Sequence, residues 1–291
     1  MRKFRIIIIS SGILLLGLKP SLVISLIPFP NPFNEKQTTT NPTQCDSSII
    51  CPGEELTYEV SWWVFKLGQI RLKILDPTFD DKQIHHNAVA YIDSYDDVPF
   101  VDIHAIDHTE MNNEFYSLGF RFFEKKKDRW LSEKSSYDKQ SKRLIIEKGW
   151  QAEVKSPIEG PLTYDTLSVK ENPFHDGLSI LFFARANIHR NHTVQVPTIV
   201  YGKIGRTIFE HRNTKTTLDV DAFDHPVRVV ELEGRAEFEG LLGMTGDFKG
   251  WFSDDIAAIP IKAELQVVLG SVTLELKSWK RIDWKPPLNE N

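Results

Sequence analysis

Alternation of apolar and polar residues with a period of two runs through most of this chain, and it constrains the fold more than any other feature. In residues 53–75, Leu56, Tyr58 and Val60 alternate with acidic and hydroxyl-bearing residues, and residues 251–276 alternate in the same way. A period of two places successive side chains on opposite faces of a β-strand. We therefore expect these two segments to form the edges of one continuous antiparallel β structure.

The period changes once, in residues 173–188. Four side chains at helical spacing follow a candidate cap at Asp176, namely Leu178, Leu181, Phe182 and Arg185. About fourteen strands and this one helix predict an all-β, mainly antiparallel fold, either a strongly curved sheet, an open barrel or a sandwich, with the α-helix covering an opening. Within this pattern, residues 65–68 are expected to form the corner between the first two strands, and residues 152–156 a further strand.

The N-terminal residues have the pattern of an export signal. Arg2, Lys3 and Arg5 precede an apolar run at residues 6–18, which is shorter than the roughly 20 residues of a spanning helix. We expect an exported protein, located in the periplasm or associated with the outer membrane, and the N-terminal segment could also hold the protein at a membrane. The predicted organisation is a signal peptide or anchor (1–25), a tether rich in Pro, Thr and Asn (26–50), a single β-rich domain (51–282) and a C-terminal tail (283–291).

Cysteine usage and charge narrow the class further. Cys45 and Cys51 are the only cysteines of an apparently exported chain, so a small disulfide loop before the first strand is the natural assignment. The formal net charge is −5, and acidic residues interrupt the basic run at residues 125–129. Such runs are usually solvated faces, and we expect no nucleic-acid partner.

Three motifs resemble those of the DUF3108 family of exported bacterial proteins. The first comprises Gly53, Glu54, Leu56, Tyr58, Val60 and Trp62; the second Asp176, Gly177, Leu178, Ser179, Leu181 and Arg185; the third Trp251, Ser253, Asp254, Asp255, Pro260, Gly270, Ser271 and Leu276. The resemblance covers residues 53–276. It implies a periplasmic or outer-membrane-associated β protein without an agreed activity, so no catalytic residues can be carried over.

The histidines and carboxylates do not assemble into a recognisable site. His104 and His108 share one strand face about 13 Å apart at roughly 3.3 Å per residue, too far apart for one metal ion. The paired acids Asp96 and Asp97, Asp254 and Asp255, and Glu54 and Glu55 are neighbours that point to opposite faces of a strand. A glycosidase-type pair would need acids from separate strands. We expect no metal and no cofactor, and the catalytic residues stay unknown.

Aromatic residues suggest a ligand surface. Trp62 and Trp63 are consecutive, so one is expected to face into the sheet and the other out, and Trp251 and Phe252 repeat the pattern. Arg185 lies on the apolar helix stripe and needs a carboxylate partner, for which we expect Asp254 or Asp255. Aromatics on both faces could line a groove. The candidate ligand-binding residues are Trp62, Trp63, Phe182, Arg185, Trp251 and Asp254.

These features favour a non-enzymatic role in the cell envelope, in which the concavity of the curved sheet binds a hydrophobic or amphiphilic ligand such as lipid, lipoprotein or glycolipid. A glycan is a further possible ligand. One alternative is a carbohydrate-active enzyme that uses carboxylates from separate strands, and another is a structural scaffold of the outer envelope. The aromatic residues do not choose between these, because a structure with both faces of its sheet covered would use them as well.

Overall fold

The computed structural model describes residues 45, 49–80, 83–99, 101–138, 140–170, 173–240, 245–267, 270–287 and 289. All of them belong to one compact unit, Thr38–Asn291. The predicted signal or anchor lies outside the described residues, and so does nearly all of the predicted tether.

Strands make up most of this unit, as the period of two predicts. Their bounds are β1 (Glu55–Trp62), β2 (Phe65–Asp80), β3 (Gln83–Ser94), β4 (His104–Met111), β5 (Ser117–Lys126), β6 (Arg129–Asp138), β7 (Arg143–Gln151), β8 (Glu159–Ser168), β9 (His175–Asp176), β10 (His192–Val200), β11 (Lys203–Leu218), β12 (Val227–Ala236), β13 (Gly246–Ser253), β14 (Pro260–Val267) and β15 (Gly270–Lys280). One α-helix, α1 (Ser179–Asn187), connects β9 to β10.

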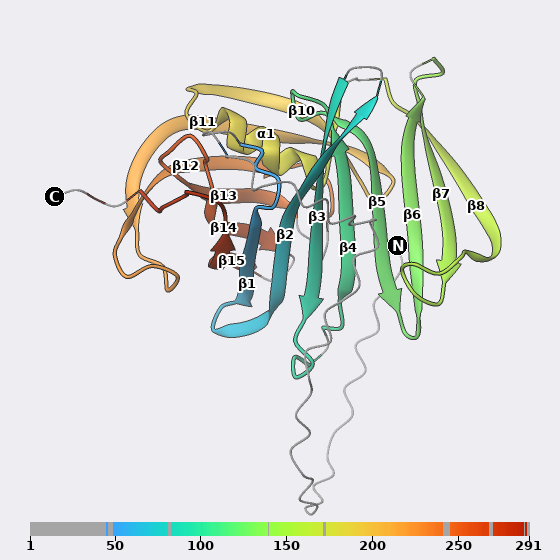
Figure 1. Cartoon of the computed structure of the whole chain (residues 1–291), viewed down its shortest axis with the longest axis horizontal. Coiled ribbons are helices and arrows are strands. Elements are labelled where there is room, and N and C mark those ends of the chain that lie inside the picture. The colour runs from blue at the N-terminus through green and yellow to red at the C-terminus, as the bar shows by residue number, and fades with distance from the viewer. Residues whose placement is uncertain are drawn as a thin grey trace, which may run out of the picture. The chain divides into compact units, whose positions relative to one another are not determined.

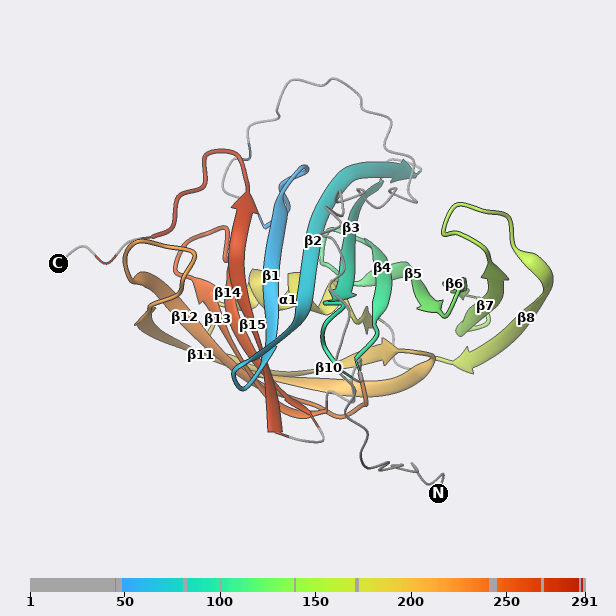
Figure 2. The same cartoon turned by 90° about the horizontal axis from the view of Figure 1, so that it is seen from below.

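The described strands form a single sheet in the order β8-β7-β6-β5-β4-β3-β2-β1-β15-β14-β13-β12-β11-β10-β9. Neighbouring strands run antiparallel, except that β9 pairs parallel with β10. The sheet curves strongly, and α1 lies on its concave side (Figures 1 and 2). Register shifts in the ladders contribute to the curvature, because each one adds local twist to a strand. The predicted fold class, a strongly curved, mainly antiparallel sheet with one helix, is confirmed.

The first and last strands lie in the middle of this sheet and not at its edges, which corrects the expectation from the sequence. In the β1–β15 pair, Glu55 lies opposite Lys280 and Trp62 opposite Val272. The edges of the sheet are β8 and β9. Local periodicity cannot reveal this, because it identifies a strand without identifying the neighbours of that strand.

The helix begins later than the sequence suggested, although Asp176 does satisfy its first turn. One carboxylate oxygen of Asp176 accepts hydrogen bonds from the backbone N–H groups of Leu178 and Ser179, at 2.8 and 2.9 Å. The Ser179 hydroxyl accepts one in return from the Asp176 N–H, at 2.8 Å, which is the reciprocal pattern of a capping box. Within the described residues, no helix combines the length and the apolar character needed to cross a membrane.

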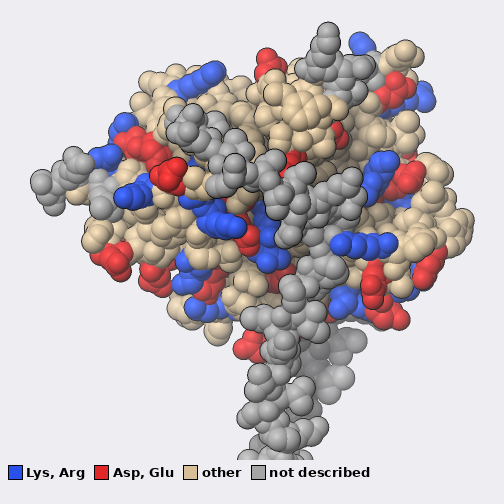
Figure 3. Space-filling view, in the orientation of Figure 1, with Lys and Arg blue, Asp and Glu red and all other residues tan. Residues whose placement is uncertain are grey.

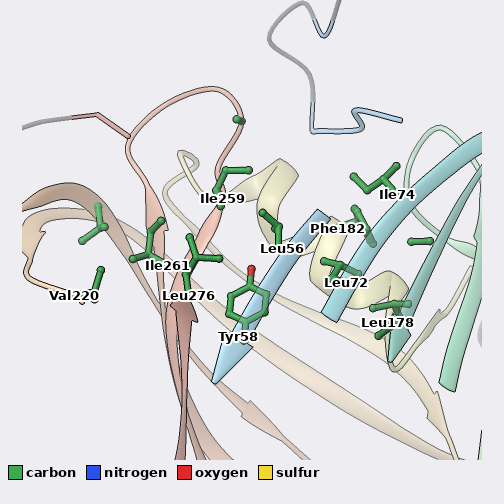
Figure 4. Close-up of a cluster of buried hydrophobic side chains, with 14 of the residues drawn as sticks. Leu56, Tyr58, Leu72, Ile74, Leu178, Phe182, Val220, Ile259, Ile261 and Leu276 are labelled. Carbon is green, nitrogen blue, oxygen red and sulfur yellow. The ribbon is translucent and has the colours of Figure 1, made fainter. Parts of the chain in front are cut away.

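The largest core cluster lies between the helix and the sheet (Figure 4). Phe182 of α1 is fully buried there among Leu56 of β1, Leu72 of β2 and Ile259, which precedes β14. Two smaller clusters extend the core along α1 and toward the sheet around β5 to β7. Packing against both halves of the sheet fixes the helix at one end of the concavity.

The hairpin between β1 and β2 turns two residues earlier than predicted. Its turn residues are Trp63 and Val64, whereas residues 65–68 already belong to β2. Gly68 has another reason to be glycine, because a Cβ atom there would meet the backbone oxygen of Asp93 at 2.2 Å. Trp63 therefore lies in the turn, and the expected in-and-out alternation of Trp62 and Trp63 on one strand is wrong.

Two further differences concern the region before the helix. Residues 152–156 form turns and bends, whereas the unpredicted strand β8 follows them. Most side chains of β8 are exposed on both faces, so this edge strand has no apolar alternation by which to recognise it.

Cys45 and Cys51 form the expected disulfide bond. The loop that they close leads directly into β1, where the Glu54 N–H donates a hydrogen bond to the Cys51 oxygen at 2.9 Å. The bridge therefore ties the start of the described chain to the first strand.

Candidate ligand-binding site

The concave side of the sheet encloses a cavity of about 380 Å³. This volume lies in the range of small-molecule sites, roughly 300–1,000 Å³. Apolar side chains dominate the wall, including Ile70, Phe120, Phe122, Leu178, Leu181, Ile199, Phe209, Leu232, Phe238, Phe248, Phe252, Leu265 and Leu274. They come from strands on both halves of the sheet and from the helix.

Small side chains on the inward face keep this space open. Ala90 of β3, Ala184 of α1, Gly250 of β13 and Ala263 of β14 all line the cavity. Larger apolar residues at these positions would fill the interior, as side chains do in close-packed cores. The sequence therefore builds a curved sheet whose inner layer is apolar but incompletely filled.

The helix closes one end of the cavity, and strand turns surround the other. Leu178, Leu181 and Ala184 of α1 contribute to the closed end. At the other end, which we call the open rim, the wall includes Gln266 near the β14–β15 turn. The Trp63–Val64 turn lies at the same end, because Trp62 is opposite Val272 at the start of β15.

A smaller pocket of about 70 Å³ leads from the cavity wall toward that hairpin. It shares Ile70, Ile92 and Leu274 with the main cavity, and it is also lined by Val60 and Val272. Val272 lies opposite Trp62 in the β1–β15 ladder. The apolar lining therefore continues to the base of the hairpin.

A carboxyl group interrupts this apolar wall at Asp107 of β4. Burial raises the pKa of Asp107 well above its ordinary value of 3.8, and the negative charge of Asp176 raises it further. Asp176 is buried and accepts hydrogen bonds from the Thr109 hydroxyl, at 2.5 Å, and from the start of α1. Asp107 is therefore favoured as a neutral acid that can donate a hydrogen bond.

Two more polar groups lie on the same side of the wall. Burial raises the pKa of the Tyr201 phenol, and the charges of Asp107, Glu124 and Glu133 act in the same direction. Glu133 of β6 pairs with Lys148 at 2.8 Å. Among the described lining residues Lys249 is the single base, and it pairs with Glu233 at 2.7 Å. The polar part of the wall therefore offers hydroxyl donors beside negative charge.

The six residues predicted to bind ligand lie outside the wall of this cavity. Trp62 and Trp63 are exposed at the β1–β2 hairpin, and Phe182 is buried in the core. Trp251 donates from its indole N–H to Glu231 at 3.2 Å, and Asp254 pairs with Lys215 at 2.9 Å. Their role in ligand binding stays a prediction.

Arg185 does form the expected ion pair, but the predicted partner is wrong. Its guanidinium donates to Glu54, with Nη1–Oε1 and Nη2–Oε2 distances of 2.8 and 3.2 Å, and also to the Ala257 oxygen at 3.0 Å. Arg281 contacts the second oxygen of Glu54. Asp255 instead accepts hydrogen bonds from the Ser253 hydroxyl and the Ala258 N–H. The buried cluster joins the start of β1, the helix and the end of β15.

The histidines of β4 lie away from the cavity. His104 contacts Asp93, with a 2.8 Å distance from Nδ1 to Oδ1. Burial lowers the pKa of His108 to about 4. Among the described residues, no group of three or more His, Cys, Asp or Glu side chains could hold a metal ion.

The sequence did not predict Asp107 as a cavity residue, although its neighbours His104 and His108 were weighed as metal ligands. The alternation along β4 does mark this residue. Asp107 is separated by even numbers of positions from Ala105, Thr109 and Met111, so it shares a strand face with these buried residues. A lone acid on the apolar face of a strand is costly to bury and marks a position worth testing.

Comparison with known proteins decides the family. A family model described as "Protein of unknown function (DUF3108)" matches residues 57–277, more than half of the chain. The chain belongs to the DUF3108 family. The matched span of this DUF3108 protein runs from β1 to β15 and includes the whole cavity wall. No curated protein matches it.

Two solved structures are similar to this DUF3108 protein. One is a β-barrel-like protein of the domain of unknown function DUF1849 from Brucella abortus, with a TM-score of 0.52 and 9% identity over 81% of this chain and 100% of that one. Another is a Bacteroides fragilis protein with a YmcC-like fold, with a TM-score of 0.36 and 7% identity over 80% of this chain and 97% of that one. The first likeness supports the fold alone.

Proposed function

We propose that this DUF3108 protein binds one apolar or amphiphilic molecule in the cavity of its curved sheet, without catalysing a reaction. The observation that carries the proposal is the cavity of about 380 Å³, which is lined mainly by apolar side chains and bounded at one end by α1. An unfilled apolar interior costs stability unless a ligand or a function compensates for it. A molecule with an acyl chain would supply the missing contacts.

The chemistry of the wall favours a ligand with an uncharged polar group. Asp107 as a neutral acid and the Tyr201 phenol can donate to a hydroxyl or carbonyl oxygen. A carboxylate or phosphate at the same position would face Asp176 and Glu133, and among the lining residues that the structure describes no unpaired base would balance its charge. We therefore propose a neutral lipid-like molecule, such as a long-chain alcohol or an ester.

A role in the cell envelope is part of the same proposal. It is supported by the basic residues and short apolar run at residues 2–18 and by the disulfide between Cys45 and Cys51, since disulfides persist in oxidising compartments. In this compartment an apolar molecule needs a protein cavity to leave its membrane.

The test is a titration of the full chain with N-phenyl-1-naphthylamine, an uncharged dye that fluoresces in apolar surroundings. We expect saturable binding with one site per chain. Ala263→Trp places a large side chain inside the cavity and should weaken binding about tenfold, since losing one well-buried apolar contact costs about 1.4 kcal/mol. Ala152→Trp, on an exposed turn, is the matched control and should bind as the unaltered protein does.

Competition then separates the ligand classes. Dodecanol should displace the dye at lower concentration than dodecanoate of the same chain length. Absence of dye binding, or binding that Ala263→Trp leaves unchanged, would overturn the cavity as the site. Equal displacement by the alcohol and the carboxylate would leave the cavity standing and overturn the preference for an uncharged group. Lipid found by mass spectrometry in an organic extract of the purified protein would support the same assignment.

A further inference from the structure

The tip of the β1–β2 hairpin exposes four consecutive apolar side chains. Trp62, Trp63, Val64 and Phe65 are 39%, 82%, 69% and 56% exposed. The rings of Trp62 and Phe65 stack with centroids 6.4 Å apart, and Trp63 meets the edge of Phe65 at the same distance. The hairpin therefore ends in one continuous aromatic cap. Single exposed apolar residues are ordinary on protein surfaces, but contiguous ones mark an interaction site.

The backbone conformation at this tip lowers the stability of the folded protein. Trp63 has a φ of +54°, the left-handed region that bulky residues rarely adopt. Two-residue hairpin turns of this kind favour Gly or Asn, which adopt such angles readily. A tryptophan held there costs of the order of 1 kcal/mol or more. Such a cost is typical of positions that are kept for a function.

The tip lies at the open rim of the cavity. Trp62 lies opposite Val272 in the β1–β15 ladder, and its indole nitrogen is 3.6 Å from the position that a Cβ on Gly270 would take. Val272 lines the small pocket that shares Ile70 and Leu274 with the main cavity. An apolar path thus leads from the exposed tip along the sheet to the cavity, on the side away from α1.

We propose that the Trp62–Phe65 tip inserts into the surface of a lipid bilayer and brings the open rim of the cavity against the membrane. This inference rests on the proposed function, because an apolar ligand that enters at the rim would then avoid water on leaving the bilayer. Tryptophan suits such a role, since its ring combines apolar area with a polar N–H and prefers the membrane–water interface. A protruding convex tip fits the deformable surface of a bilayer better than it fits a rigid groove.

The test places a fluorescent label at the tip of the full chain with its disulfide intact. Among the described residues no free cysteine remains, so Val64→Cys introduces a single addressable thiol there. It is labelled with the environment-sensitive fluorophore NBD and mixed with vesicles of phosphatidylethanolamine and phosphatidylglycerol. We expect a blue shift and a severalfold rise in fluorescence. Phe79 is 71% exposed at the opposite end of β2, so Phe79→Cys is the matched control. Its label should show neither the blue shift nor the rise in fluorescence.

A second variant separates insertion from folding. Trp63→Gly in the labelled Val64→Cys background removes the largest ring and suits the positive φ. It should raise the vesicle concentration that gives half of the fluorescence change about tenfold, because it removes one buried aromatic side chain. Its thermal unfolding midpoint should not fall. An unchanged vesicle concentration would contradict the proposal.

The outcomes distinguish the two proposals. No response of the Val64 label to vesicles overturns docking at this tip, even if the cavity binds the dye. A response that appears on raising the protein concentration without vesicles assigns the tip to a second copy of the chain and also overturns the proposal. Insertion of the tip in a protein that fails to bind dye supports docking and overturns the cavity function alone.

Discussion

Arg185 and Glu54 form a buried, two-pronged ion pair across 131 residues of sequence. The side chains of both residues are fully buried, and Arg281 adds a second cation to the same carboxylate. The pair holds the helix against the first strand, and so fixes the closed end of the cavity. On the face shown in Figure 3, acidic and basic side chains are interspersed.

Removing one member of this pair should destabilise the protein strongly. Arg185→Leu leaves Glu54 with Arg281 alone and removes the hydrogen bond to the Ala257 oxygen. We expect a loss of about 3–5 kcal/mol in the free energy of unfolding, as for other broken buried pairs. Urea unfolding followed by circular dichroism measures it. Lys203→Leu, which removes a surface pair of 3.6 Å with Glu239, should change stability little, and an equal loss in both variants would contradict this account.

Gly68 should tolerate no side chain. Gly68→Ala would place a methyl group 2.2 Å from the Asp93 oxygen and 2.7 Å from the Ser94 Cα, both of them backbone atoms. Separating β2 from β3 at this point should cost about 3 kcal/mol, as severe overpacking does. Gly119→Ala is the control, because its nearest contact is 3.4 Å. If thermal unfolding midpoints show equal effects, the close approach of β2 and β3 is not what Gly68 provides.

Asp107 should make the protein less stable as pH rises. The unfolded chain releases this proton near pH 3.8, whereas burial and Asp176 raise the pKa in the folded protein. Between the two pKa values the folded state binds more protons, so stability falls with increasing pH until the raised pKa is passed. Asp107→Asn keeps the shape and abolishes the titration. The free energy of unfolding of Asp107→Asn minus that of the unaltered protein should therefore be larger, that is more stabilising, at pH 8 than at pH 4.5, and a pH-independent difference would refute the assignment.

His211 should act in the opposite direction. Burial and, to a smaller extent, the neighbouring His192, with its ring stacked at 4.9 Å, lower its pKa in the folded protein to about 4. The unfolded state therefore binds the extra proton between about pH 6.5 and 4, and stability present above pH 6.5 is lost as pH falls through this interval. His211→Phe should reduce that loss in urea unfolding at pH 7 and pH 4.5. His225→Phe, at an exposed position, should leave the loss unchanged.

The sequence was sufficient for the kind of fold. Alternation such as that of Leu56, Tyr58 and Val60 identifies a strand because one face is buried and the other wet, and the helical spacing after Asp176 identifies α1. The strand β8 could not be predicted, because apolar and polar residues alternate only where one face of a strand is buried, and most side chains of β8 are exposed. The pairing of β1 with β15 could not be predicted either, since these two strands meet only through the curvature of the whole sheet.

The candidate site could be predicted only in part, because its residues are brought together by the strand pairing. A buried arginine requires a carboxylate, so the need for a partner of Arg185 was predictable, but the choice of Glu54 over Asp254 follows from which strands meet at the helix. The cavity is likewise a property of the curvature and of small residues such as Ala90 and Ala263. Of the aromatic residues that stood out in the sequence, Trp62 and Trp63 lie at the hairpin tip and Phe182 lies in the core, whereas Phe252 lines the cavity.

From β1 to β8 and from β9 to β15, each strand lies beside the strand that precedes it in the chain, and β1 pairs with β15. If the end of β15 were joined to the start of β1 and the chain were opened between β8 and β9, every strand from β9 through β15 and on to β8 would lie beside its predecessor. Such a circular permutant would keep the same native sheet while replacing its longest-range pairing by a local one. It should fold faster than the natural order, because fewer distant segments must meet before the sheet can form.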